Sequence, residues 1–368
     1  MLNNRLITGL GVLMLMACGV FVNISLTACG DGKKKDSTLN FYQADDPLIR
    51  YTGRIDFSDK LKPKFWQPGV YIEWAFEGDS CILILEDEML WGDSHNYFEL
   101  VVDGKEQRLQ MKTKRDTILV ATDAGPGIHR VFFCKNTEAG IGYMRFAGIS
   151  CQKLVPLPPP MKRKIEFIGN SITSGMGSDE SEIPCGKGVW YDQHNAYQSY
   201  GAIAARSMNA QYHLSSVSGI GLMHSCCEMK VIMPQVFDKV NMRDDSVDWN
   251  FTNYQPDVVS VCLGQNDGIQ DSATFCSNYI LFIKTLRKHY PSATIVCLTS
   301  PMANDQLMPV LKKYLAAITK EVNKADSNVH TYFFSKRYSR GCGEHPSLEE
   351  HQEIAGELTV FLRELMKW

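Results

Sequence analysis

The second half of the chain alternates short apolar runs with longer amphipathic stretches, and this order constrains the fold most. The apolar runs are predicted to be strands and the amphipathic stretches helices. The predicted strands are residues 165–168, 258–263, 293–298 and 330–334, and the predicted helices are 195–208, 278–289, 306–322 and 347–366. Strands separated by helices pair in parallel, because each helix returns the chain to the start of the sheet. We therefore expect an α/β fold in which helices cover both faces of a parallel sheet, giving three layers.

The part of the chain before residue 155 has a different pattern. Its apolar runs are short, alternate with polar residues, and are rich in branched and aromatic side chains, as at residues 70–76, 81–85, 97–102 and 130–133. Asp103-Gly104 is a hairpin signal between two such runs. This pattern predicts an all-β sandwich of jelly-roll type.

Prolines separate the two parts. Residues 154–160 read LVPLPPP, which favours a stiff, extended spacer. The predicted organisation is a β-sandwich domain at residues 39–154, a linker at 155–163 and an α/β domain at 164–368.

Residues 1–29 resemble a bacterial lipoprotein signal peptide. Arg5 precedes an apolar run at residues 6–22, and the sequence LTAC ends at Cys29, which we expect to carry the lipid. Residues 30–38 then form a polar tether. Cleavage at Cys18 is the alternative, but it would leave a very short apolar segment. A membrane-spanning helix is the other alternative, although the run is shorter than the roughly 20 residues that a span needs.

Charge and cysteine content exclude several classes of protein. The net charge is -3 and no basic cluster is large enough to bind nucleic acid. Of 12 cysteines, Cys18 and Cys29 lie in the leader, which leaves ten. Cys226 and Cys227 are adjacent but have no partner pair at zinc-site spacing. We expect no metal and no cofactor, and the sequence leaves any disulfide pairing open.

Ser171 and His345 are the two candidate reactive residues. Ser171 follows the apolar run 165–168 in the sequence GNSIT, so a strand would deliver it to the carboxyl edge of the sheet. His345 precedes Pro346, which disfavours helical geometry and keeps the ring in a loop. A serine hydroxyl needs a base to become a nucleophile, and a histidine can supply that base. Taken alone, each residue is better explained more simply, Ser171 as a helix cap and His345 as a surface loop residue.

Gly219 and Asn266 are candidate donors to an oxyanion. Asn266 follows the predicted strand 258–263 in the sequence GQND, and its side-chain amide can donate to a developing negative charge. Gly219 follows another strand-like run, 212–217, and offers an unobstructed backbone N–H. Simple turn residues are the alternative for both.

The ordered set Ser171, Gly219, Asn266 and His345 resembles the SGNH, or GDSL-type, hydrolase superfamily. The resemblance implies that Ser171 is the nucleophile and His345 the base. It also implies that the oxyanion is held by the N–H groups of Ser171 and Gly219 and by the Asn266 amide.

The front part of the chain and residues 195–206 resemble carbohydrate esterase family 2. That resemblance implies a jelly-roll domain and removal of acetyl groups from xylan or other plant polysaccharides. It also implies an aromatic residue near the sugar site, and Trp249 lies in the corresponding region. A tryptophan of the core or surface is the alternative.

The superfamily usually has an aspartate two or three residues before the histidine, and this chain departs from that pattern. Cys342 and Gly343 occupy those positions, and Glu344 is adjacent to His345. A main-chain carbonyl can orient the ring instead, because it only accepts a hydrogen bond. We therefore expect a Ser-His dyad oriented by a carbonyl near residues 342–344, with the Glu344 carboxylate as the alternative.

These observations predict an exported, membrane-anchored carbohydrate O-acetyl esterase acting on xylan, mannan or glucan. Two alternatives stay open. The missing acid allows a glycan-binding protein with weak or lost esterase activity. The shared chemistry of the superfamily allows a lysophospholipase or thioesterase, because a fold does not fix its substrate. The sequence does not determine the oligomeric state.

Overall fold

The computed structural model describes residues 38–121, 125–244 and 246–368. The predicted signal peptide, Cys29 and all of the predicted tether except Thr38 lie outside these residues. Thr38–Trp368 form one compact unit. Within the described ranges, no helix has both the length and the apolar character needed to cross a membrane.

The first part is an antiparallel β structure, as the alternating pattern predicts. Its strands pair in the order β1-β9-β4-β8-β5-β6, and β2 and β7 pair with β4 while β3 pairs with β9. The strands are β1 Asn40–Tyr42, β2 Arg50–Thr52, β3 Lys64–Phe65, β4 Tyr71–Asp87, β5 Tyr97–Val102, β6 Lys105–Gln110, β7 Arg115–Ala121, β8 Gly127–Lys135 and β9 Met144–Val155. Their apolar side chains enclose one core that includes Trp74, Phe98 and Phe133.

Two details of this part test the sequence interpretation. The Asp103-Gly104 hairpin is confirmed: both residues have positive φ, and Val102 pairs with Lys105 across the turn. The separate strands predicted at residues 70–76 and 81–85 are wrong, because β4 runs continuously through both. The register of β4 against β9 shifts between Glu77 and Cys81, so the intervening polar residues form a bulge and not a reversal.

The second part contains a five-stranded, fully parallel sheet. Its order is β11-β10-β12-β13-β14, so β10, which precedes Ser171, lies between β11 and β12. The strands are β10 Arg163–Gly169, β11 Ala210–Ser216, β12 Val258–Val261, β13 Thr294–Leu298 and β14 Val329–Tyr332. The longer helices are α2 Tyr200–Ser207, α4 Ser272–His289, α5 Leu307–Val322 and α6 Leu348–Met366. The short helical turns are η1 Ala139–Ile141, α1 Ser171–Ser174, α3 Met233–Val236, η2 Phe251–Asn253 and η3 Cys342–Glu344.

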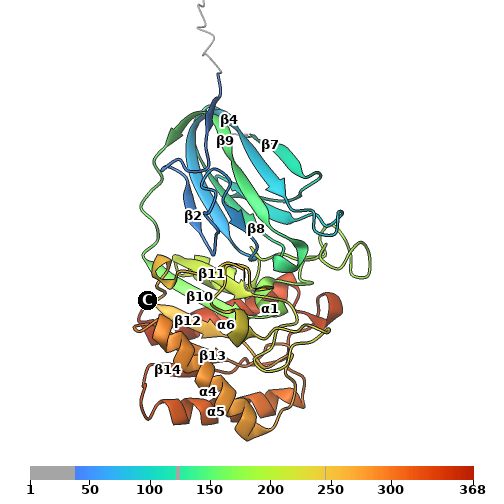
Figure 1. Ribbon diagram of the computed structural model, residues 1–368, viewed down its shortest axis with the longest axis vertical. Helices are drawn as coiled ribbons and strands as arrows, with labels where there is room; N and C mark the ends of the chain where they lie inside the picture. Colours follow the sequence, from blue (N-terminus) through green and yellow to red (C-terminus); the bar gives the residue numbers. More distant parts are fainter. Residues whose placement is uncertain (1–37, 122–124, 245) are drawn as a thin grey trace, which may run out of the picture. The chain divides into compact units, whose positions relative to one another are not determined.

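Helices cover both faces of the parallel sheet, which confirms the predicted three layers (Figure 1). Ile168 on β10 packs in the core that contains α4 and α5. The preceding Phe167 points to the opposite face and packs in the core that contains α2 and α6. This alternation follows from the two-residue period of a strand.

The helix boundaries correct two predictions. The helix predicted to begin at Asn195 begins at Tyr200, because the Asn195 side chain forms a turn by accepting from Gln198 N at 3.0 Å. The helix predicted at residues 278–289 begins earlier, at Ser272, where the Asp271 side chain caps it. The predicted capping box at the start of α6 is confirmed: the Ser347 hydroxyl accepts from Glu350 N, and the Glu350 carboxylate accepts from Ser347 N.

The two parts contact each other directly. Arg54, in the loop after β2, forms a buried ion pair of 2.9 Å with Glu166 on β10. The rings of Tyr71 on β4 and Tyr212 on β11 lie 5.0 Å apart. Between β9 and β10, residues 156–162 have no regular secondary structure. These contacts join the β part to the middle of β10 and to the first half of β11.

Candidate active site

Ser171 lies at the first position of α1, directly after the turn that ends β10. The side chain of Asn170 caps the helix by accepting from Ile172 N at 3.2 Å. Gly169 is required in this turn, because a Cβ there would lie 2.1 Å from Thr173 Oγ1. The turn therefore presents the Ser171 hydroxyl at the carboxyl edge of the sheet, as the sequence predicts.

His345 reaches this hydroxyl from the far end of the chain. Its backbone is extended before Pro346, with φ -80° and ψ 162°, which agrees with the effect expected of the proline. The Nε2 atom of His345 lies 2.8 Å from Ser171 Oγ, although 174 residues separate the two. This distance is within the range that a nucleophile and its base require.

Main-chain carbonyls contact the other ring nitrogen of His345. Nδ1 lies 3.0 Å from Gly343 O and 3.2 Å from Cys342 O. A carbonyl only accepts, so the proton is assigned to Nδ1 and the Nε2 lone pair faces the serine. The side chain of Glu344 is 74% exposed and pairs with Arg337. Its carboxylate therefore points away from the ring.

Burial lowers the pKa of His345 below the ordinary histidine value of 6.5. The hydrogen bonds to the Gly343 and Cys342 carbonyls act in the opposite direction, because they favour the protonated ring. Since burial dominates, the imidazole is neutral at pH 7. A neutral imidazole can accept a proton, as a general base must.

Gly219 and Asn266 lie on the same cleft as Ser171 and His345. Gly219 follows β11 with φ +82°, and a Cβ there would lie 2.9 Å from Cys226 Sγ. Asn266 follows β12, and its Nδ2 donates to Ile220 O at 2.8 Å. This bond fixes the plane of the amide, which has a second N–H to offer a ligand. The structure thus brings together all four residues of the predicted set.

Asp267 organises the loop that follows Gly219, and the sequence interpretation gave it no role. Its carboxylate is 4% exposed and accepts from three successive backbone N–H groups. These are Leu222 N at 3.0 Å, Met223 N at 2.6 Å and His224 N at 3.0 Å. The signal was present in the sequence GQND, where an acidic residue follows Asn266 at a strand end.

Glu138 is a second residue that the sequence interpretation missed. It lies in the β part, is 1% exposed, and accepts from Ser218 N at 2.6 Å. Burial alone would raise the pKa of Glu138, but the nearby His194 ring and the Ser218 N–H outweigh it and hold the pKa below its usual value. The ionised carboxylate therefore fixes the segment that carries Gly219.

The cleft has a volume of about 680 Å³ and contains residues from both parts of the chain. Trp190 lines it and is 51% exposed. The rings of Tyr191 and His194 pack against Trp190 in T-shaped contacts, with ring centroids 5.9 and 4.9 Å away. Cys226 and Cys227 also line the cleft and are bonded to each other.

Trp249 does not line this cleft. It is 7% exposed and packs in a cluster with Trp66 and Tyr254. Its ring also lies 5.5 Å from the Arg54 guanidinium carbon. The structure therefore places Trp249 beside the buried Arg54–Glu166 pair, away from Ser171, and Trp190 is the aromatic residue at the cleft.

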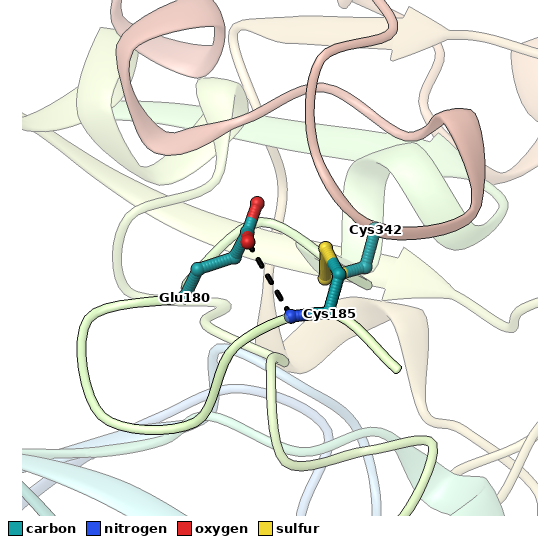
Figure 2. A group of neighbouring side chains, drawn as sticks. All are labelled: Glu180, Cys185 and Cys342. Atoms are coloured by element: carbon teal, nitrogen blue, oxygen red, sulfur yellow. Dashed lines mark hydrogen bonds between the residues drawn. A yellow bond between two sulfur atoms is a disulfide. The ribbon is translucent and has the colours of Figure 1, made fainter. Parts of the chain in front are cut away.

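One group of side chains in the described residues has the spacing of metal ligands. Glu180, Cys185 and Cys342 offer ligand atoms within 4.8 Å of one another. Figure 2 shows that the two sulfur atoms are joined in a disulfide and that Glu180 accepts from Cys185 N, at 3.3 Å. Bonded sulfurs are not thiolates, so this group is a cross-link.

Comparisons with known proteins agree with the fold and the site. Residues 51–160 match the model of the carbohydrate esterase 2 N-terminal domain, and residues 167–333 match the GDSL-like lipase/acylhydrolase family. The second part of the chain is thus an SGNH-type, GDSL-like domain. More particularly, the chain combines the two domains of the family two carbohydrate esterases and is close to those enzymes.

Three of the similar proteins are named esterases. The chain is 31% identical to "Cellulase/esterase CelE" of Acetivibrio thermocellus over 88% of its own length, but it spans only 40% of that protein. It is 26% identical to an "Acetylxylan esterase / glucomannan deacetylase" of Cellvibrio japonicus, covering 93% of this chain and 96% of that one. A family two carbohydrate esterase from Clostridium thermocellum, solved with cellohexaose, superposes with a TM-score of 0.80 at 29% identity, covering 87% of this chain and 99% of that one.

Proposed function

We propose that this protein is a serine esterase that removes O-acetyl groups from plant polysaccharides or their oligosaccharides. The observation that carries the proposal is the 2.8 Å contact between Ser171 Oγ and His345 Nε2 on an open cleft. The names of its relatives support a carbohydrate substrate.

The first half of the reaction forms an acetyl-enzyme. Ser171 Oγ attacks the acetyl carbonyl carbon while its proton moves to His345 Nε2. The oxyanion that forms accepts hydrogen bonds from the N–H groups of Ser171 and Gly219 and from the Asn266 amide. The tetrahedral intermediate then collapses, the C–O bond to the sugar breaks, and His345 returns the proton to the sugar oxygen.

The second half releases acetate. Water attacks the acetyl-enzyme while His345 accepts one of its protons, and the Ser171 oxygen leaves with that proton. Nε2 of His345 accepts and returns the proton in both halves of the reaction. Nδ1 of His345 keeps its proton throughout, because the carbonyls only accept.

The position of Trp190 favours a sugar substrate, because Trp190 lines the same cleft as Ser171. A half-exposed indole face is flat and apolar, like the C–H face of a pyranose ring, and neighbouring rings hold it in place. We propose that Trp190 stacks on the sugar next to the acetylated unit.

The test is acetate release by Ser171→Ala from acetylated xylo-oligosaccharides and from 4-nitrophenyl acetate. We expect kcat to fall by about four orders of magnitude or more. The exposed Ser292, before β13, provides a matched control: Ser292→Ala should keep full activity. Unchanged release by Ser171→Ala would refute the proposal. Binding of unacetylated glucan with no turnover by the unaltered protein would favour a glycan-binding role, and preference for long acyl chains would favour a lysophospholipase or thioesterase.

We also propose export and anchoring through a lipid on Cys29, and the division into domains at residues 39–154 and 164–368. The leader pattern of residues 1–29 supports the anchor. Cys29→Ser should move the protein from the membrane fraction to the soluble fraction, whereas a membrane-spanning leader would keep it at the membrane.

A further inference from the structure

The disulfide between Cys185 and Cys342 joins two loops, each of which carries a residue that lines the cleft. The cysteines are 157 residues apart in the sequence. Cys185 lies in the irregular segment between α1 and α2, which also carries Trp190. Cys342, drawn in Figure 2, is the first residue of η3, and it precedes His345 by three positions in the sequence.

Cys342 is also one of the two residues whose carbonyl accepts from the His345 ring. Its oxygen lies 3.2 Å from Nδ1 and accepts from His345 N at the same distance. Its own N–H donates to Gly177 O at 2.7 Å. Cys342, whose carbonyl orients the histidine, is therefore held through its own N–H and through its sulfur.

The contact between the two loops is tight. Gly177 has φ +67°, and a Cβ there would lie 2.6 Å from Cys342 O. Gly341 N donates to His345 O at 2.7 Å, which closes the turn around Cys342. The turn that carries His345 thus rests on the turn that follows Ser171.

The Cys342 and Gly343 carbonyls stand where a triad has a carboxylate, and they can orient His345 only if their backbone is held in place. A peptide carbonyl can only point where its flanking residues hold it, and Gly343 and Glu344, which follow Cys342, are both exposed with left-handed backbones. A catalytic group must be held to within about 0.5 Å of its working position. A covalent tie to the opposite loop restricts the motion of this exposed turn.

We propose that the Cys185–Cys342 disulfide is a positioning element for the catalytic histidine, a role beyond that of a general stabilising cross-link. It holds the Cys342 and Gly343 carbonyls against Nδ1, as the carboxylate does in a triad. It also couples the turn of His345 to the segment that carries Trp190. This inference rests on the proposed esterase function.

The test compares the unaltered enzyme with C185S/C342S, using 4-nitrophenyl acetate at 25 °C, well below the unfolding transition. We expect kcat of the double variant to fall at least tenfold while KM changes less than twofold. A dithiol reductant, which converts the disulfide to two thiols and is itself oxidised to a cyclic disulfide, should lower kcat of the unaltered enzyme to the same level. Removal of the reductant in the presence of oxidised glutathione should restore it.

Two controls separate this disulfide from the other cysteines. C226S/C227S lacks the second disulfide and should lose activity on reduction by the same factor as the unaltered enzyme. Cys276→Ser, which replaces a free thiol on α4, should respond to the reductant as the unaltered enzyme does. The reductant should have no effect on C185S/C342S.

The NMR signal of the proton on Nδ1 of His345 reports the position of the ring, and a loss of stability alone would not change it. In the oxidised enzyme its proton NMR signal should be shifted downfield and protected by the carbonyls, and in C185S/C342S it should be lost to exchange. Full kcat together with an unchanged Nδ1 proton signal in the folded double variant would overturn the inference.

Inactivation by a chelator, with no response to the reductant, would also overturn it in favour of a metal at Glu180, Cys185 and Cys342. Ser171→Ala, measured alongside, tests the esterase function separately.

Discussion

The carboxylate of Glu344 pairs with the guanidinium of Arg337, and the neighbouring His345 ring hydrogen-bonds main-chain carbonyls instead. Glu344 has a left-handed backbone, with φ +60°, which turns its side chain out of the site. The residue adjacent to the base therefore takes no part in orienting it.

Glu344→Gln and Glu344→Ala should each change kcat by no more than about twofold, as is usual for an exposed side chain. Loss of an orienting acid from a triad lowers turnover by about 10⁴-fold. Orientation of His345 by carbonyls and orientation by Glu344 therefore predict very different rates. Steady-state rates with 4-nitrophenyl acetate decide between them. A loss of several orders of magnitude in both variants would refute the carbonyl assignment.

The pH profile of kcat/KM should reflect the lowered pKa of His345. Only the neutral ring can accept the serine proton, so activity falls as the pH drops through the pKa. Because burial holds that pKa below 6.5, the rate should be level at neutral pH and reach half its maximum below pH 6.5. A midpoint above pH 7 would contradict the assignment of His345 as a buried, neutral base.

Glu138→Gln should lower kcat by about tenfold, because a weaker bond would hold Ser218 and hence the Gly219 segment. The Glu138 charge also raises the pKa of His345, so its removal should move the acid limb of the pH profile to lower pH. A purely structural role would lower the amount of folded enzyme without moving that limb. Unchanged kcat and an unchanged profile would exclude any role for Glu138.

Trp190→Ala should separate binding of the sugar from chemistry at the ester. KM for acetylated xylo-oligosaccharides should rise about tenfold, equivalent to roughly 1.4 kcal/mol, while kinetics with 4-nitrophenyl acetate stay within twofold. Trp91 is 81% exposed and does not line the cleft, so Trp91→Ala is the matched control and should bind normally. Equal effects of the two variants on KM would argue against stacking by Trp190.

Glu166→Leu should destabilise the protein strongly, because it leaves the Arg54 guanidinium buried and unpaired. Arg54 and Glu166 have side chains only 1% and 0% exposed, and breaking a buried pair typically costs about 3–5 kcal/mol. Urea unfolding measures the loss. Glu77 and Lys153 form an exposed pair at 3.6 Å, so Glu77→Gln should cost less than about 1 kcal/mol. A similar small cost for Glu166→Leu would show that the buried pair adds little.

Local patterns in the sequence predicted the layers and marked Ser171 and His345 as candidates, whereas their proposed roles came from the ordered set that they form with Gly219 and Asn266. The strand and helix periods identified β10 and α6. The turn before Ser171 predicted that its side chain lies at the end of a strand, and the proline after His345 predicted that its ring lies in a loop. The helix predicted from Asn195 failed because the Asn195 side chain forms a turn of its own, which periodicity does not reveal.

Contacts between distant segments could not be predicted. Glu138 reaches Ser218 across 80 residues and from the other part of the chain, so no local motif marks it. Ten cysteines allow many pairings, and only the fold brings Cys185 to Cys342. Trp249 and Trp190 both lie outside the predicted strands and helices, and burial alone distinguishes the one in the core from the one at the cleft.

Detection of a covalent intermediate on Ser171 would test the proposed esterase mechanism at its first step. The enzyme is mixed with an acetylated xylo-oligosaccharide, quenched in acid within the first turnovers, digested and analysed by mass spectrometry. We expect one added acetyl group on the peptide that contains Ser171, and none in His345→Ala. Acetate release with no acetyl group on Ser171, or with the acetyl group on another residue, would contradict it.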